Sequence, residues 1–81
     1  MGWHDALIKM GIPYESGEAL ELGSKVMAAI NETCREVSIE LAKERGPYPG
    51  WVPQAPSEEP IRNATRTCIA PTGTISAIAG A

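Results

Sequence analysis

The residues of this sequence best suited to chemistry are the hydroxyl-bearing residues and the glycine between positions 72 and 76. Thr72, Thr74 and Ser76 place three hydroxyl groups around Gly73, where the backbone can approach a ligand without a Cβ in the way. A short helix is expected from Thr74, and the free backbone N–H groups of residues 72–76 would then converge at its positive end. Phosphate is favoured at such a helix end, so the pattern predicts a phosphate-binding turn.

An extended run before this turn and a helix after it must hold it in place. The run consists of residues that favour a pleated, half-buried strand, namely Thr65, Thr67, Cys68 and Ile69. Pro71 ends the run, and Gly80 is placed to close the helix that follows. The apolar residues of that helix fall on one face, namely Ile75, Ile78 and Ala79. Similar turns occur in many proteins that bind nothing, so a plain structural turn is the competing interpretation.

Residues 62–76, Arg-Asn-Ala-Thr-Arg-Thr-Cys-Ile-Ala-Pro-Thr-Gly-Thr-Ile-Ser, resemble the substrate-phosphate loop of the large catalytic subunit of ribonucleotide reductases. The resemblance is greatest to the adenosylcobalamin-dependent type. It continues in residues 1–14, which resemble the start of a helix pair in the catalytic barrel, and in Glu-Arg-Gly-Pro-Tyr-Pro at 44–49. It implies that backbone amides and hydroxyls of the loop hold the substrate phosphates. The matching positions are Thr72, Gly73, Thr74, Ile75 and Ser76.

The resemblance also implies an enzyme that replaces the ribose 2′-hydroxyl with hydrogen by radical chemistry. Its substrate would be a ribonucleoside di- or triphosphate, and the parent enzyme would use adenosylcobalamin. The family's radical-carrying cysteine with its asparagine and glutamate, its redox cysteine pair and its cobalamin and regulatory nucleotide sites have no counterpart here. We therefore expect an internal fragment that supplies the phosphate loop, binds no cofactor or metal, and is inactive alone. No catalytic residue is assigned.

Two helices are predicted before the C-terminal stretch. Residues 3–10 have one apolar face, and Gly11-Ile12-Pro13 ends that helix. Ser16 is placed to cap a second helix running to about Arg45, which would span roughly 45 Å. Its apolar residues keep helical spacing, namely Ala19, Gly23, Val26, Met27, Ile30, Cys34, Val37, Leu41 and Ala42. Cys34, Met10 and Met27 are expected to fill core space, and Cys68 to be a buried or half-buried thiol.

Prolines at five positions between 47 and 60 forbid regular structure, so a connecting loop is predicted there, with Trp51 packed back on the helices. The predicted fold is mostly α: a short helix, a long helix, a Pro-rich loop, one strand, and a phosphate loop with a short helix. We assign residues 1–45 to the helical pair, 46–60 to the loop, and 61–81 to the strand and phosphate loop. Together they would form a piece of the reductase α/β barrel.

The composition limits the classes of function. The net charge of −3 argues against a general nucleic-acid binder, and Arg62 and Arg66 are the only charged residues after Glu59, so the phosphate-loop end is locally positive. Because no apolar run approaches the roughly 20 residues that a membrane span needs, and no signal pattern opens the chain, we expect a cytoplasmic protein without membrane contact. Two cysteines and one histidine make a structural metal site improbable.

Two other functions stay open at this stage. The chain could be a stand-alone helical hairpin that acts as a binding or assembly module without catalytic activity, or a weak phosphate-binding protein unrelated to reduction. A chain of 81 residues barely supports a core of its own, and the long apolar stripe would need cover. We therefore expect the remainder of a reductase chain as the natural partner, and a homo-oligomer when the fragment is alone.

Overall fold

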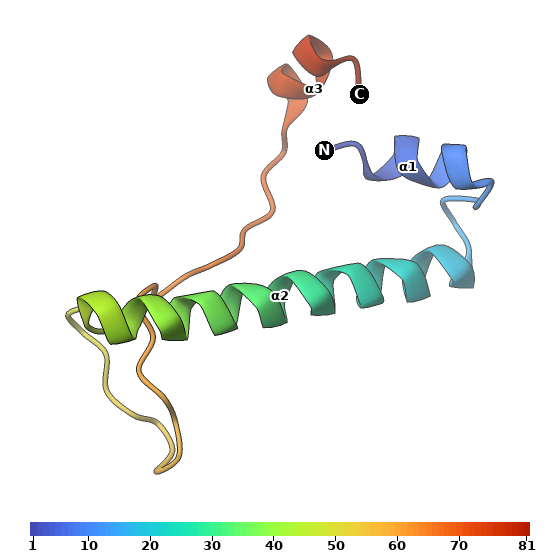
Figure 1. The fold of residues 1–81 in the computed structure, drawn as a ribbon. Helices are drawn as coiled ribbons and strands as arrows, with labels where there is room; N and C mark the ends of the chain where they lie inside the picture. Colours follow the sequence, from blue (N-terminus) through green and yellow to red (C-terminus); the bar gives the residue numbers. More distant parts are fainter. The chain divides into compact units, whose positions relative to one another are not determined.

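The computed structural model describes residues 1–81 and contains three helices and no β-strand (Figure 1). The helices are α1 (Trp3–Met10), α2 (Gly17–Arg45) and α3 (Gly73–Ala79). The chain divides into two units, one of residues 1–26 with 69–81 and one of residues 27–68. None of the helices combines the length and the apolar content that crossing a bilayer requires.

The predicted first helix and its end are confirmed. Gly11 adopts the left-handed conformation (φ 71°), and its N–H donates to the carbonyl of Ile8 at 3.1 Å. The N–H of Ile12 donates to the carbonyl of Leu7 at 2.9 Å, so the last carbonyls of the helix are satisfied before Pro13. Leu7 is fully buried and is the main apolar anchor of α1.

The second helix begins and ends where the sequence predicts. The Ser16 hydroxyl oxygen accepts the N–H of Ala19 at 3.1 Å, the N-cap bond expected at this position. At the other end, Gly46 takes a left-handed conformation (φ 82°) and donates its N–H to the carbonyl of Ala42 at 2.8 Å. The 29 residues between these caps give a helix about 44 Å long.

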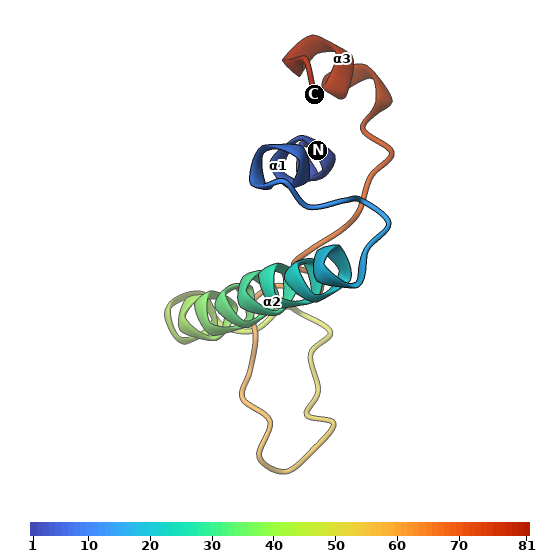
Figure 2. The same cartoon turned by 90° about the vertical axis from the view of Figure 1, so that its right-hand side faces the viewer.

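Residues 46–60 form the predicted irregular loop, which leaves the end of α2 and returns to it (Figures 1 and 2). The return ends at Ile61, which is buried and whose carbonyl accepts the N–H of Tyr48 at 3.1 Å. Trp51 is half-buried, and its indole Nε1 is buried without a hydrogen-bond partner.

The predicted strand over residues 65–69 is wrong. A strand needs a second strand to satisfy its backbone groups, and the described chain offers none. One side chain of this run instead bonds to α2, where the Thr67 hydroxyl donates to the Asn31 side-chain oxygen at 3.2 Å. Ile69, which a sheet would bury, is 94% exposed. The fold is therefore mostly helical, and the strand-favouring residues mark an extended segment.

Three side chains expected to fill a core do not do so here. Met10 and Met27 are 51% and 40% exposed, and the Cys68 thiol is exposed rather than buried or half-buried. A single long helix with one short neighbour has too few elements to cover a whole apolar stripe, so these residues stay open to solvent. Cys34, which was also expected to fill core space, is half-buried on α2.

Candidate functional site

The predicted phosphate loop lies at the start of α3, and its unusual backbone residue is a threonine. Thr72 is the N-cap residue and has left-handed angles (φ 55°, ψ 22°), whereas the φ of Gly73 is not positive. A β-branched residue rarely adopts this conformation, which costs about 1–2 kcal/mol. The Thr72 side chain makes no capping hydrogen bond that would offset this cost. The conformational freedom of glycine is therefore not what shapes the turn.

Three backbone donors are left free at this turn. The first N–H of α3 that finds a carbonyl within the chain is that of Ser76, which donates to Thr72 at 2.9 Å. The N–H groups of Gly73, Thr74 and Ile75 have no partner in the chain, as is usual for the first turn of a helix. Of the five N–H groups that were predicted to converge over residues 72–76, that of Ser76 is therefore already bonded, while the N–H of Thr72, which precedes the helix, also has no partner in the chain.

The hydroxyls of the loop differ in what they can offer a ligand. The Ser76 hydroxyl donates to the Gly73 carbonyl at 2.8 Å, so its proton is used inside the turn. The hydroxyls of Thr72 and Thr74 make no hydrogen bond in the chain. Gly73 and Thr74 are exposed, and a Cβ built on Gly73 would meet nothing within 4 Å. Ligand atoms can therefore approach the free N–H groups over Gly73.

The two arginines predicted to make this end of the chain positive are engaged within residues 27–68. The Arg62 guanidinium donates to the carbonyls of Arg45 and Gly46, at 3.4 Å each, where a cation also suits the negative end of α2. The Arg66 guanidinium donates to the Asn63 carbonyl at 3.3 Å. Residues 67–81 carry no charged side chain, so the loop offers only neutral donors of its own.

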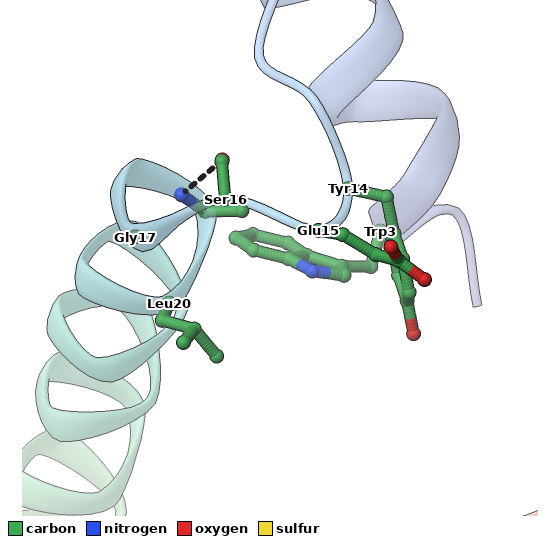
Figure 3. A pocket seen from close by; sticks show the side chains of 7 residues that line it. Trp3, Tyr14, Glu15, Ser16, Gly17 and Leu20 are labelled. Carbon is green, nitrogen blue, oxygen red and sulfur yellow. Dashed lines mark hydrogen bonds between the residues drawn. The ribbon is translucent and has the colours of Figure 1, made fainter.

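A pocket of about 440 Å³ lies where the connection from α1 enters α2 (Figure 3), and the sequence reasoning did not identify it. It is lined by Trp3, Tyr14, Glu15, Ser16, Gly17, Ala19 and Leu20. The Trp3 indole forms one wall, and the Tyr14 ring stacks at an angle on His4 with their centroids 4.8 Å apart. Most of the lining is apolar, and it gathers no set of groups that points to a reaction.

Nucleophiles and metal ligands are scattered in the described structure. Cys34 and Cys68 are both free, and nowhere do three or more His, Cys, Asp or Glu side chains gather closely enough to hold a metal ion. The turn at residues 72–76 was the one site predicted from the sequence, and in the structure it is the start of α3. Its groups are hydrogen-bond donors without charge.

The comparisons with known proteins agree on one family. A family model described as "Ribonucleotide reductase, barrel domain" matches residues 1–59. The vitamin B12-dependent ribonucleoside-diphosphate reductase of Thermoplasma acidophilum is 55% identical over 82 aligned residues, which cover 99% of this chain and 11% of that protein. The enzyme of the same name from Mycobacterium tuberculosis is 43% identical over 81 residues, or 99% of this chain and 12% of that protein.

The similarity extends to reductases of other sources over a shorter stretch. The ribonucleoside-diphosphate reductase large subunit of Ostreid herpesvirus 1 is 38% identical over 50 residues, which are 62% of this chain and 6% of that protein. No solved structure matches the chain. The chain spans about a tenth of the length of its two vitamin B12-dependent relatives. Their alignments leave almost none of this chain out, so they include the turn at residues 72–76.

Proposed function

Because this chain belongs to the ribonucleotide reductase family, we propose that residues Thr72–Ser76 hold the phosphates of a ribonucleotide substrate in the complete enzyme. The observation that carries this proposal is the row of unpartnered backbone N–H groups on Gly73, Thr74 and Ile75. Backbone donors at a helix start suit an anion, and in this turn no side-chain charge competes with them. The family relationship suggests a ribonucleotide as the ligand, and the turn offers backbone N–H donors for its phosphates.

The complete protein, in this proposal, is an oxidoreductase that converts ribonucleoside diphosphates to 2′-deoxyribonucleoside diphosphates. The two relatives that align over almost the whole chain are named vitamin B12-dependent ribonucleoside-diphosphate reductases, which favours a diphosphate over a triphosphate. Adenosylcobalamin would supply the radical chemistry when bound elsewhere in the enzyme. The donors at residues 72–76 suit phosphate oxygens rather than cobalt, and we assign no residue of this chain to the cofactor.

The contribution of each loop residue follows from its bonds. Thr74 has a free hydroxyl, so Thr74→Ala removes one bond to a charged group, worth about 1.5–3 kcal/mol, and should weaken substrate binding by roughly ten- to a hundredfold at most. Ser76→Ala should cost less than Thr74→Ala, because the Ser76 proton already bonds to the Gly73 carbonyl. Gly73→Val should cost more than either, because a branched side chain would stand where the phosphate must approach.

The experiment is binding of a ribonucleoside diphosphate to the complete reductase that carries each substitution. A Cβ built on Gly73 meets nothing within 4 Å in this chain, so the Cβ of Gly73→Val adds no clash here, and we expect its effect on binding to come from the space that it takes from the phosphate. Ser24→Ala, an exposed serine of α2, is the matched control and should bind like wild type. If Gly73→Val binds like wild type while a hydroxyl deletion abolishes binding, the backbone-donor assignment is wrong.

A second candidate function, an assembly module of helices, is favoured by one observation. Apolar side chains in the middle of α2 are 39–47% exposed, namely Val26, Met27, Ile30 and Val37. An exposed row of this kind marks a surface that another element covers. We propose that the remainder of the reductase chain covers it in the complete enzyme, since the relatives are about nine times as long as this chain. In the isolated chain a second copy would take its place.

A further inference from the structure

The most buried polar side chain of this protein lies far from the loop in sequence. Ser38, in the C-terminal half of α2, is 1% exposed. Its hydroxyl donates to the side-chain oxygen of Asn63 at 3.0 Å and accepts the backbone N–H of Asn63 at 3.0 Å. Burying a hydroxyl without hydrogen-bond partners would destabilise the fold, so the burial of Ser38 depends on its two bonds to Asn63.

The residues just before Asn63 are aligned with the same part of α2. The backbone N–H of Arg62 donates to the carbonyl of Ser38 at 3.0 Å, and Ile61, the residue before it, is buried. Arg62 and Asn63 are therefore held to one turn of the helix by three hydrogen bonds to a single serine. A slip by one residue would break all three bonds.

The segment after Asn63 makes one further hydrogen bond to α2. Thr67 donates its hydroxyl to Asn31 at 3.2 Å, and Asn31 lies seven residues before Ser38. Seven helical residues span about 10 Å and four extended residues about 13 Å, so the segment runs along α2 in the opposite direction. Four residues, 68–71, then connect Thr67 to the start of the phosphate loop at Thr72.

We propose that Ser38 is a positioning residue for substrate phosphate: through Asn63 it fixes the point on α2 from which the chain continues to the phosphate loop. The inference rests on the proposed function of residues 72–76. It gives a role in substrate binding to a residue outside that loop, which acts without touching the substrate. Without the serine hydroxyl, Asn63 loses both of its hydrogen bonds to α2, and the segment keeps only the backbone bond from Arg62 and the bond between Thr67 and Asn31. The loop that follows would then be held less accurately, and small displacements of binding groups cost large factors in rate.

The test compares variants of the complete reductase with two ligands, a ribonucleoside diphosphate and the unphosphorylated ribonucleoside. Ser38→Ala and Asn63→Ala should each raise the KM for the diphosphate about tenfold and leave binding of the ribonucleoside within about twofold of wild type. Combining the two changes should cost little more than Ser38→Ala alone, because the one bond that Asn63→Ala removes is among the two that Ser38→Ala removes. Since Asn63 is exposed, Asn63→Ala serves where Ser38→Ala folds poorly.

Two further variants separate positioning from general damage. Both observed bonds use the side-chain Oδ1 and the backbone N–H of Asn63, so Asn63→Asp keeps them and should behave like wild type. Ser24→Ala on the same helix is the surface control.

Equally weakened binding of both ligands, or an unchanged KM for the diphosphate in both alanine variants, would overturn the inference. If Gly73→Val weakens diphosphate binding while the alanine variants do not, the phosphate loop stands and only the positioning role fails; if Gly73→Val has no effect either, both are wrong.

Discussion

The indole of Trp3 lies against the backbone of Gly23, where a Cβ would stand 3.4 Å from Cζ2 and 3.9 Å from Cη2 of the ring. This contact joins α1 to the first half of α2. The absence of a side chain at Gly23 lets the ring approach the helix closely, but the remaining distance is that of ordinary van der Waals contact. One methyl group therefore fits between the two residues, and a larger side chain does not.

We expect Gly23→Ala to stabilise the helical pair by roughly 0.5–1 kcal/mol, because alanine is favoured over glycine in a helix by about this amount. Gly23→Leu should instead destabilise it by about 1–3 kcal/mol, since the added atoms displace the indole. Thermal unfolding of the 81-residue chain followed by circular dichroism measures both changes. A stabilising leucine would contradict the packing of Trp3 on Gly23.

Ser16→Ala should lower the stability of α2 by about 1 kcal/mol, because the variant loses the cap bond to the N–H of Ala19. The same substitution at Ser24, inside the helix and exposed, removes no hydrogen bond and should be neutral or slightly stabilising. Hydrogen exchange at the Ala19 amide reports the cap directly. Exchange there that is no faster in Ser16→Ala than in Ser24→Ala would show that the cap is not formed.

The isolated chain should self-associate through the exposed row of α2, with two copies packing these helices antiparallel as the simplest closed arrangement. Ile30→Glu places a charge in the middle of that row and should shift the chain toward monomer. Light scattering at about 0.1 mM measures the mass of both forms. A folded wild-type monomer at this concentration would count against self-association.

The chain alone should form no deoxynucleotide when adenosylcobalamin and a dithiol are supplied. Its two cysteines are both free and differ in exposure, and it covers about a tenth of its vitamin B12-dependent relatives. Radical generation and re-reduction need groups that we place in the rest of the enzyme. Detection of any deoxynucleotide product above a no-protein control would refute this expectation.

The helices and their ends could be predicted from the sequence because their causes are local. Gly11 with Pro13, the Ser16 cap and Gly46 each act within one turn, and the structure has all of them. The strand could not be judged in the same way, because strand formation depends on a pairing partner that may lie anywhere in a protein. Residues 65–69 have the composition of a strand but lie beside no other strand in this chain.

The bond between Ser38 and Asn63 was missed for a related reason. A serine beside the apolar residues Val37 and Ile39 was the available signal, since a hydroxyl facing a core needs a partner. Nothing local pointed to Asn63, 25 residues later. In the loop itself, the left-handed conformation of Thr72 was not predicted, because residue types do not determine the backbone angles of a single β-branched residue.

The most direct test of the central claim is hydrogen–deuterium exchange of the peptide that contains Gly73, Thr74 and Ile75 in the complete reductase. These N–H groups have no partner within the chain, so they should exchange rapidly without ligand. A saturating ribonucleoside diphosphate should slow their exchange, and the unphosphorylated ribonucleoside should not. Exchange that is unchanged by the diphosphate, or slowed equally by both ligands, would contradict the proposal that this turn binds the substrate phosphates.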